Sequence, residues 1–426
     1  MSIPVTCSCG RSFSAQPHLA GKTVRCPSCS QPLQIPGASA PAFTTTQPQP
    51  TNPTVASAQF PAQQPTWNAA QPVFSAGGAA QTQVAGQTSG KKTLWIVLGV
   101  VGGGIGLLML VCCGSVAYML RPPTGSAASK QPFNIASAPL PQFPDRSQPN
   151  QIDGGIKHYY IELGNGSGYG IPAGHNSAFN LYLPPGEHAP GSLPCVLITG
   201  AGTPMFYGYK LGDLSQYSAD VPEFLPYAEA GFAVVAYDMD GAVDDYEAES
   251  DSALRKGYVA FVTAGAGVVN GRNAYEFLLK KVPEVDPQRV YSAGHSSAGS
   301  TSLLLAAHEP RLAGAIAYAP CYDLPERLTP IGVRTLSALL PKFVDFSIQS
   351  SPKTQESRIK CPIFLFHAAD DSNVPASASR EAKQRMQALG INCTYVEVPT
   401  GEHYESMIEE GIPAGIKWLN SIDKGS

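Results

Sequence analysis

From residue 153 onward, short apolar runs alternate with segments in which apolar residues recur every three or four positions. Such runs are typical of buried strands, and the recurring spacing is typical of amphipathic helices. The alternation predicts one α/β domain over 153–426, with a mostly parallel sheet covered by helices on both faces. The predicted strands are 156–163, 178–183, 195–200, 232–238, 290–294, 313–320, 362–367 and 393–398, and the predicted helices are 267–281, 297–309, 376–389 and 404–419.

The interval 321–360, between two of the predicted strands, is interpreted as a small helical lid. Its apolar residues can either face a substrate or pack against the domain, and packing is the interpretation we favour. These residues are Leu328, Leu339, Leu340 and Phe343.

A longer apolar stretch precedes this domain. Residues 94–120 contain no charged residue and exceed the roughly 20 residues that a helix needs to cross a bilayer. We therefore predict a transmembrane helix over 92–120. A buried core helix is the alternative, but the length, the glycine content and the lack of charge argue against it. A cleaved signal peptide is disfavoured, because the stretch is too long and begins far from the N-terminus.

The basic residues beside this stretch predict its orientation. Lys91 and Lys92 precede it, and Arg121 follows it. Because the cytoplasmic side carries the excess of Lys and Arg, we expect a single-pass protein with a cytoplasmic N-terminus and an extracytoplasmic α/β domain. Cys112 and Cys113 then lie toward the outer half, where lipid-facing or packing roles are favoured over palmitoylation.

Two other segments are poor in residues that can build a core. Residues 37–91 are dominated by Gln, Pro, Ala, Thr and Ser, and residues 121–152 are rich in Pro, Ser and Ala. We predict a disordered linker for the first and a second linker for the other. The net charge of −4 and the pI near 6.1 lack the basic footprint of nucleic-acid binding, so no nucleic-acid partner is predicted.

A candidate nucleophile stands where the apolar strand 290–293 runs into the sequence GHSSA (294–298) and then into an apolar helix. A serine on a tight strand-to-helix turn needs small neighbours, and the helix N-terminus stabilises negative charge. The pattern predicts Ser296 as the nucleophile. Ala298 replaces the second glycine of the usual G-x-S-x-G, and alanine is small enough for the turn. Two alternatives remain: Ser297 as nucleophile, or a turn that only caps the helix.

A serine nucleophile needs a downstream base, and three histidines follow Ser296. His308 falls inside the helix after the turn, and His367 ends a strand, where a structural role is favoured. His403 lies between the last strand and the last helix, so its loop is expected at the carboxyl ends of the strands. We predict His403 as the base, the alternative being a polar residue that only begins a helix.

The base in turn needs a carboxylate to fix its tautomer and stabilise the imidazolium. Asp370 and Asp371 stand just beyond the strand 362–367, in a loop that leads to a helix. We predict Asp371 as the partner of His403 and assign Asp370 to holding the turn.

Three segments together resemble the signatures of α/β-hydrolases related to prolyl oligopeptidase and dienelactone hydrolase. They are GHSSAG (294–299), HAADDSNVP (367–375) and GEHY (401–404), and the resemblance covers roughly 155–422. It implies the α/β-hydrolase fold, with Ser296 as nucleophile, Asp371 as acid and His403 as base. Ala368 and Ala298 depart from the common glycines without removing a reacting group. Unlike the cysteine of dienelactone hydrolases, this turn carries serine.

The negatively charged oxygen that forms when a serine attacks a carbonyl group must be stabilised by backbone N–H donors. We expect the N–H of Ser297 and one from Gly200-Ala201-Gly202, where glycines let the backbone approach the substrate; the amide of Ala201 is our choice. In related enzymes this loop carries an H-G-x-G-like segment, and Thr199 replaces its histidine.

The expected substrate class depends on whether the chain carries a domain that restricts access to the active site. Prolyl oligopeptidases normally carry a large propeller, which residues 1–150 cannot form. We therefore expect hydrolysis of a small acyl ester, a thioester or a short peptide or amide, with no cofactor for catalysis. The alternative is a non-catalytic ligand-binding or signalling scaffold with a hydrolase-like domain.

The N-terminal segment 1–36 resembles a short zinc ribbon. Four thiolates suit tetrahedral zinc, and a segment of this size needs such a staple to fold. Two redox-active pairs are the alternative, disfavoured in a reducing cytosol. Three roles stay open for the module: binding a protein partner, binding nucleic acid, or neither. Nucleic acid is disfavoured because Arg11, Lys22 and Arg25 are its only basic residues. The predicted ligands are Cys7, Cys9, Cys26 and Cys29.

Overall fold

The computed structural model describes two parts of the chain. The first consists of four short strands at 3–6, 12–15, 23–25 and 32–34, and the second covers 124–163, 172–175, 178–215, 221–243 and 251–423. The contacts divide the chain into the units Met1–Gln87 and Thr88–Ser426. The predicted linker 37–91 and the predicted span 92–120 lie outside the described residues. Among the residues that are described, no helix is both long and apolar enough to cross a membrane.

The N-terminal unit contains two antiparallel strand pairs. Strand β1 (Ile3–Thr6) pairs with β2 (Ser12–Ala15), and β3 (Thr23–Arg25) pairs with β4 (Pro32–Gln34). The four predicted zinc ligands lie outside the described residues. Along the chain, one cysteine pair falls between β1 and β2 and the other between β3 and β4.

A nine-stranded sheet forms the centre of the second unit, in the order β13-β12-β11-β10-β8-β9-β7-β6-β5. Neighbours from β13 to β9 run parallel, and the pairs from β9 to β5 are antiparallel. The prediction of a mostly parallel sheet is therefore confirmed. The strands are β5 (Asn150–Gln151), β6 (Lys157–Glu162), β7 (Ala178–Leu183), β8 (Leu193–Ile198), β9 (Ala233–Tyr237), β10 (Val285–Ala293), β11 (Gly314–Tyr318), β12 (Ile363–Ala368) and β13 (Cys393–Val398).

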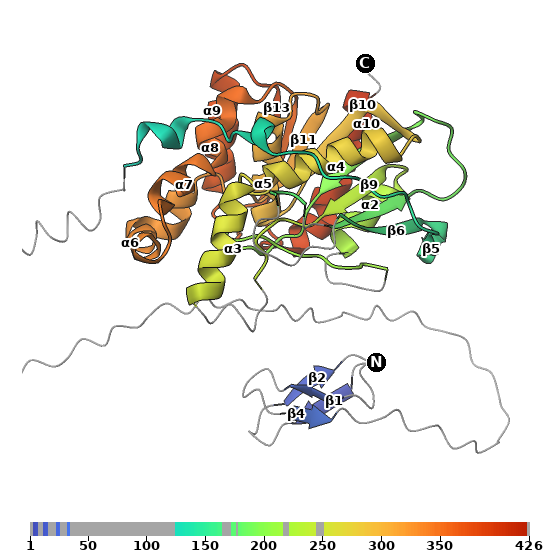
Figure 1. Cartoon of the computed structure of the whole chain (residues 1–426), viewed down its shortest axis with the longest axis horizontal. Coiled ribbons are helices and arrows are strands. Elements are labelled where there is room, and N and C mark those ends of the chain that lie inside the picture. The colour runs from blue at the N-terminus through green and yellow to red at the C-terminus, as the bar shows by residue number, and fades with distance from the viewer. Residues whose placement is uncertain are drawn as a thin grey trace, which may run out of the picture. The chain divides into compact units, whose positions relative to one another are not determined.

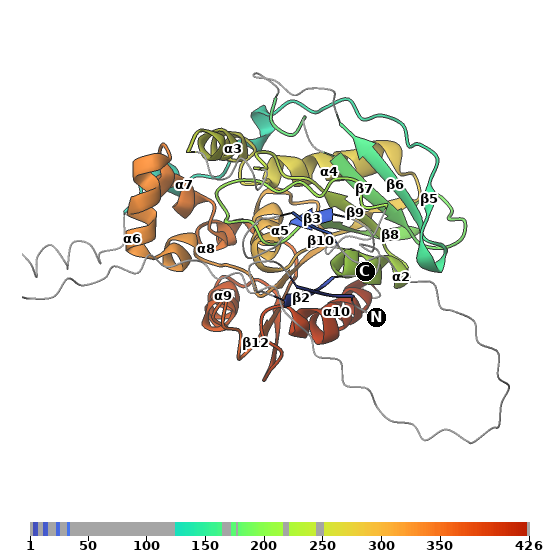
Figure 2. The ribbon, with the colours of Figure 1, turned by 90° about the horizontal axis from the view of Figure 1, so that it is seen from below.

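Helices cover both faces of this sheet (Figures 1 and 2). Successive side chains of a strand point to opposite faces, so a buried strand contributes apolar side chains to the core on both sides. In β8, Leu197 joins the core under α4 (Val268–Lys281), α5 (Ser296–His308) and α9 (Ser377–Ala388). Its neighbours Val196 and Ile198 join the core under α2 (Val221–Glu229) and α10 (Ile412–Asp423). Buried on both faces, the strand is apolar throughout.

The predicted lid is helical. Between β11 and β12 lie α6 (Leu324–Leu339), α7 (Phe343–Gln349) and α8 (Pro352–Gln355). Asp323 is the N-cap of α6, and its carboxylate accepts the Glu326 N–H. The ring of Phe343 contacts the ring of Phe206 and the ring of Tyr258, which belongs to α3 (Asp251–Thr263), with centroids 6.0 Å apart in each pair. Leu340 and Phe343 are each only 1% exposed, so the packing interpretation is confirmed for these two.

The segment before β5 differs from its prediction as a linker. Residues 124–149, called the strap below, lie against the domain. Phe133 and Phe143 are buried, and Arg272 Nη1 donates to the carbonyls of Ile135 and Ala138 at 2.6 and 3.0 Å. The apolar residues of the strap are too widely spaced to form a helical or strand pattern, and for that reason the sequence alone suggested a tether.

Candidate active site

The turn from β10 into α5 holds Ser296 in a strained conformation. Ser296 has a φ of 53°, in the left-handed region that residues other than glycine rarely adopt, and it is the first residue of α5. Strain of this kind persists only where the surrounding structure imposes it. Ser296 is partly exposed, whereas His295 and Ser297 are buried. A nucleophile elbow has this geometry.

Close backbone packing explains the small residues of the turn. A Cβ on Gly294 would lie 2.3 Å from the carbonyl carbon and oxygen of Ala298, so no side chain fits at position 294. Ala298 is fully buried, and its methyl group is accommodated where the usual pattern has glycine. The departure at Ala298 is therefore compatible with the elbow.

His403 and Asp371 form a hydrogen-bonded pair. His403 Nδ1 donates to Asp371 Oδ2 at 2.7 Å, which fixes the tautomer and leaves the lone pair on Nε2. His403 Nε2 is buried and has no hydrogen-bond partner among the described residues, so it is not yet bonded to Ser296 Oγ. Catalytic hydrogen bonds are often loose without substrate and tighten in the complex.

Asp371 is held as a charged group. Its Oδ1 accepts the backbone N–H groups of Asn373 and Val374 at 2.9 and 2.8 Å, and its Oδ2 also accepts from His367 Nε2 at 3.0 Å. Burial by itself raises the pKa of Asp371. The hydrogen bonds from His367, His403 and Val374 outweigh that effect and hold the pKa well below its usual value. The carboxylate is thus available to stabilise an imidazolium on His403.

The loop that carries His403 is itself strained. Gly401 and Glu402 have φ values of 117° and 53°. The Asp370 carboxylate accepts both of their backbone N–H groups, at 3.2 and 2.9 Å. Asp370 therefore holds the turn, as the sequence suggested, while Asp371 reaches His403.

The loop expected to supply an oxyanion donor lies against the elbow. The Thr203 N–H donates to Ser297 Oγ at 3.1 Å, and Thr199 Oγ1 donates to the Tyr237 carbonyl at 2.8 Å. Ala201 stands between these two fixed points and is partly exposed. With its hydroxyl bonded to the loop, Ser297 has a structural role that weakens its candidacy as the nucleophile.

The two histidines assigned to structural roles make structural contacts. His308 Nδ1 donates to the Leu304 carbonyl at 2.8 Å, and its Nε2 accepts the Phe133 N–H of the strap at 3.1 Å. His367 is fully buried and accepts from Ser379 Oγ at 2.8 Å while supporting Asp371. Sequence reasoning gave no role to His295, although its place beside the nucleophile was the available signal.

The scattered cysteines are unpaired. Cys195, Cys321, Cys361 and Cys393 are free thiols, and all but Cys393 are buried. Burial raises the pKa of the Cys361 and Cys393 thiols to about 11 and that of Cys321 to about 12. These thiols are protonated at neutral pH, so none is an activated nucleophile.

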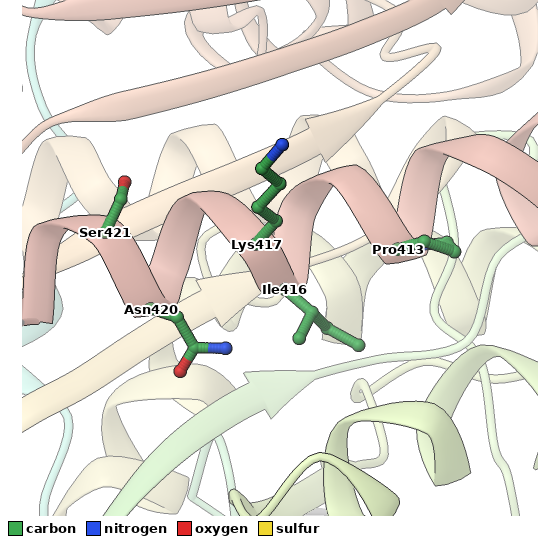
Figure 3. Close-up of a pocket in the computed structure, with 5 residues that line it drawn as sticks. All are labelled: Pro413, Ile416, Lys417, Asn420 and Ser421. Carbon is green, nitrogen blue, oxygen red and sulfur yellow. The ribbon is translucent and has the colours of Figure 1, made fainter.

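A shallow depression on the outer side of α10 is separate from this site (Figure 3). It is lined by that helix alone, and none of the triad candidates contributes to it. We therefore assign it no part in the chemistry. Its residues are Pro413, Ile416, Lys417, Asn420 and Ser421.

Comparison with known proteins concerns the domain that carries these residues. Residues 221–412 match the sequence model of the prolyl oligopeptidase family, Peptidase_S9. This range includes Ser296, Asp371 and His403.

Two curated plant proteins are similar to the chain. The probable chloroplastic glutamyl endopeptidase of Arabidopsis thaliana is 27% identical over 238 residues, which are 52% of this chain and 23% of that protein. The protein of the same name from Oryza sativa subsp. japonica is 26% identical over 205 residues, or 45% of this chain and 20% of that protein. The chain thus spans less than a quarter of the length of these relatives.

Among solved structures, acetyl xylan esterase 1 from Thermoanaerobacterium sp. JW/SL YS485 superposes with a TM-score of 0.50 at 16% identity. The match covers 71% of this chain and 96% of that one. The second unit has the α/β-hydrolase fold. Taken with the family match, the comparisons support a serine hydrolase of the esterase or peptidase kind.

Proposed function

We propose that this protein is a membrane-anchored serine hydrolase whose catalytic triad is Ser296, Asp371 and His403. The proposal rests on the 2.7 Å hydrogen bond from His403 Nδ1 to Asp371 Oδ2. It gives a downstream histidine the tautomer of a general base, in a domain whose elbow presents a strained, partly exposed serine.

The triad would act through an acyl-enzyme. Ser296 Oγ attacks the substrate carbonyl carbon, and its proton passes to His403 Nε2. The backbone N–H groups of Ser297 and Ala201 bind the resulting oxyanion. His403 then gives the proton to the leaving oxygen, sulfur or nitrogen as that bond breaks. Water then attacks the acyl carbonyl carbon and gives a proton to His403. As the bond to Ser296 Oγ breaks, His403 passes that proton to Oγ, which releases the acid and restores both residues.

We propose small acyl esters, thioesters or short peptides and amides as substrates. In support, the names of similar proteins include an endopeptidase and an acetyl xylan esterase. The lid helices α6 and α7 lie at one side of the domain (Figures 1 and 2). Helix α7 packs on the strap and, through Phe343, on Tyr258 of α3, and α6 packs on α7.

Activity-based labelling tests the proposal. The full chain in detergent is expected to react stoichiometrically with a fluorophosphonate probe, because an activated serine attacks phosphorus as it attacks a carbonyl. Pairs of p-nitrophenyl esters and p-nitroanilides with the same acyl group would then separate esterase from amidase activity. If the folded native chain is not labelled, the enzyme proposal is wrong.

We further propose that the N-terminal unit is a cytoplasmic zinc ribbon and that the hydrolase domain is extracytoplasmic. In support, each cysteine pair falls along the chain between two antiparallel strands. Cys7 and Cys9 would complete a tetrahedral site with Cys26 and Cys29, in which zinc has a purely structural role. The ribbon is then positioned to bind a protein partner in the cytoplasm.

One labelling experiment tests both location and metal. In intact cells treated with a membrane-impermeant chelator, a membrane-impermeant maleimide is expected to leave the four N-terminal cysteines unlabelled. After lysis they should react only once a strong chelator has removed zinc, because the metal shields the thiolates. A variant with serine at all four positions identifies their signal. Labelling before lysis contradicts the orientation, and labelling after lysis without chelator contradicts the zinc site.

A further inference from the structure

His295, the residue before Ser296, connects two members of the proposed triad. Its Nε2 lies 2.8 Å from the main-chain carbonyl oxygen of His403. The two imidazole rings are also in contact, with centroids 4.5 Å apart and planes tilted by 45°. His295 is only 4% exposed. One side chain of the elbow thus touches both the ring and the backbone of the candidate base.

The protonation state of His295 follows from these contacts. A carbonyl oxygen only accepts, so His295 Nε2 carries the hydrogen and donates it. Nδ1 is 3.9 Å from Glu223 Oε1, too far for a direct hydrogen bond. Burial and the neighbouring His403 lower the pKa of His295 to about 3. A neutral ring beside His403 does not oppose the positive charge that the base acquires.

The loop that carries His403 needs such support. Gly401 and Glu402 both have positive φ values, and strained backbone is kept only by contacts that fix it. Asp370 holds the loop before His403 through the Gly401 and Glu402 N–H groups. His295 holds it at His403 itself, through the main-chain carbonyl.

We propose that His295 is a positioning residue that fixes His403 relative to Ser296 by donating Nε2–H to the His403 carbonyl. The inference rests on the proposed triad and adds a residue to it. A shift of about 1 Å in a catalytic group can cost on the order of a hundredfold in rate. Losing this hydrogen bond should therefore reduce turnover more than it reduces substrate binding.

Two substitutions separate the hydrogen bond from packing. His295→Phe keeps a ring but removes the donor, and we expect kcat per labelled active site to fall about 10- to 100-fold with KM changed less than threefold. His295→Gln keeps a side-chain N–H at a similar reach, and it should recover most of the loss. The readouts are kcat, KM and the rate of fluorophosphonate labelling of the full chain, normalised to active sites.

His158 supplies a matched control. It is also fully buried, its Nε2 bonds Asn180 Oδ1 at 2.9 Å, and its ring lies 4.9 Å from Tyr182 in a tilted contact. His158→Phe should lower the melting temperature but leave kcat per active site unchanged.

Two outcomes would overturn the role of His295: normalised kcat in His295→Phe within twofold of native, or a His295→Gln variant as slow as the Phe variant. Either result would leave the triad intact, because labelling of the native chain is measured separately. A native chain without labelling would instead remove the proposed function itself.

Discussion

Ser296→Ala is expected to lower kcat for the best ester substrate by about a million-fold, with substrate binding largely kept. The nucleophile and its base act as a unit, so removing either one forfeits nearly all of the covalent mechanism. What remains is the contribution of the oxyanion donors and of binding. Turnover of purified Ser296→Ala and native chains, with substrate affinity measured by calorimetry, provides the check.

Ser297→Ala is the matched comparison, because it makes the same change one residue later. It removes the hydroxyl that accepts the Thr203 N–H but keeps the Ser297 backbone amide. We expect a loss of about tenfold or less, from a less firmly held loop. A larger loss in Ser297→Ala than in Ser296→Ala would transfer the nucleophile to Ser297.

Much of the central sheet could be predicted from the sequence because parallel strands are buried on both faces. Runs such as 195–198 and 363–366 are apolar without interruption, and they lie within β8 and β12. Helices α2 and α3 were not predicted. Pro226 inside α2 argues locally against a helix, and the packing of Phe224 and Tyr227 against the sheet overrides that preference.

The triad candidates could be proposed from the sequence because a nucleophile, an acid and a base each need a particular residue type just after a strand. Ser296 follows β10, Asp371 follows β12 and His403 follows β13. The choice between Asp370 and Asp371 followed from chain position, and the structure gives each a separate set of partners. The contact from His295 to the His403 carbonyl joins residues 108 positions apart. No local pattern encodes such a contact, so only the folded chain reveals it. The strap escaped prediction for a similar reason.

Asp371→Asn is expected to lower kcat by about 10⁴-fold with little change in KM. The native carboxylate accepts the Nδ1–H of His403 at 2.7 Å and so keeps a lone pair on Nε2. An asparagine NH₂ turned toward His403 would favour the other tautomer, whose Nε2–H cannot take a proton from Ser296. The loss should appear in steady-state turnover and in the rate of fluorophosphonate labelling alike.

Asp370→Asn is the neighbouring control for that experiment. Its amide oxygen can still accept one of the two backbone N–H groups of Gly401 and Glu402, so a loss of about tenfold or less is expected. Hydrogen bonds hold the pKa of Asp371 well below its usual value. Asp371 therefore stays charged at any pH above that lowered pKa, and mild acidification should not mimic the Asn variant. Equal losses in the two variants would mean that both carboxylates only support the loop, and the triad would then lack its acid.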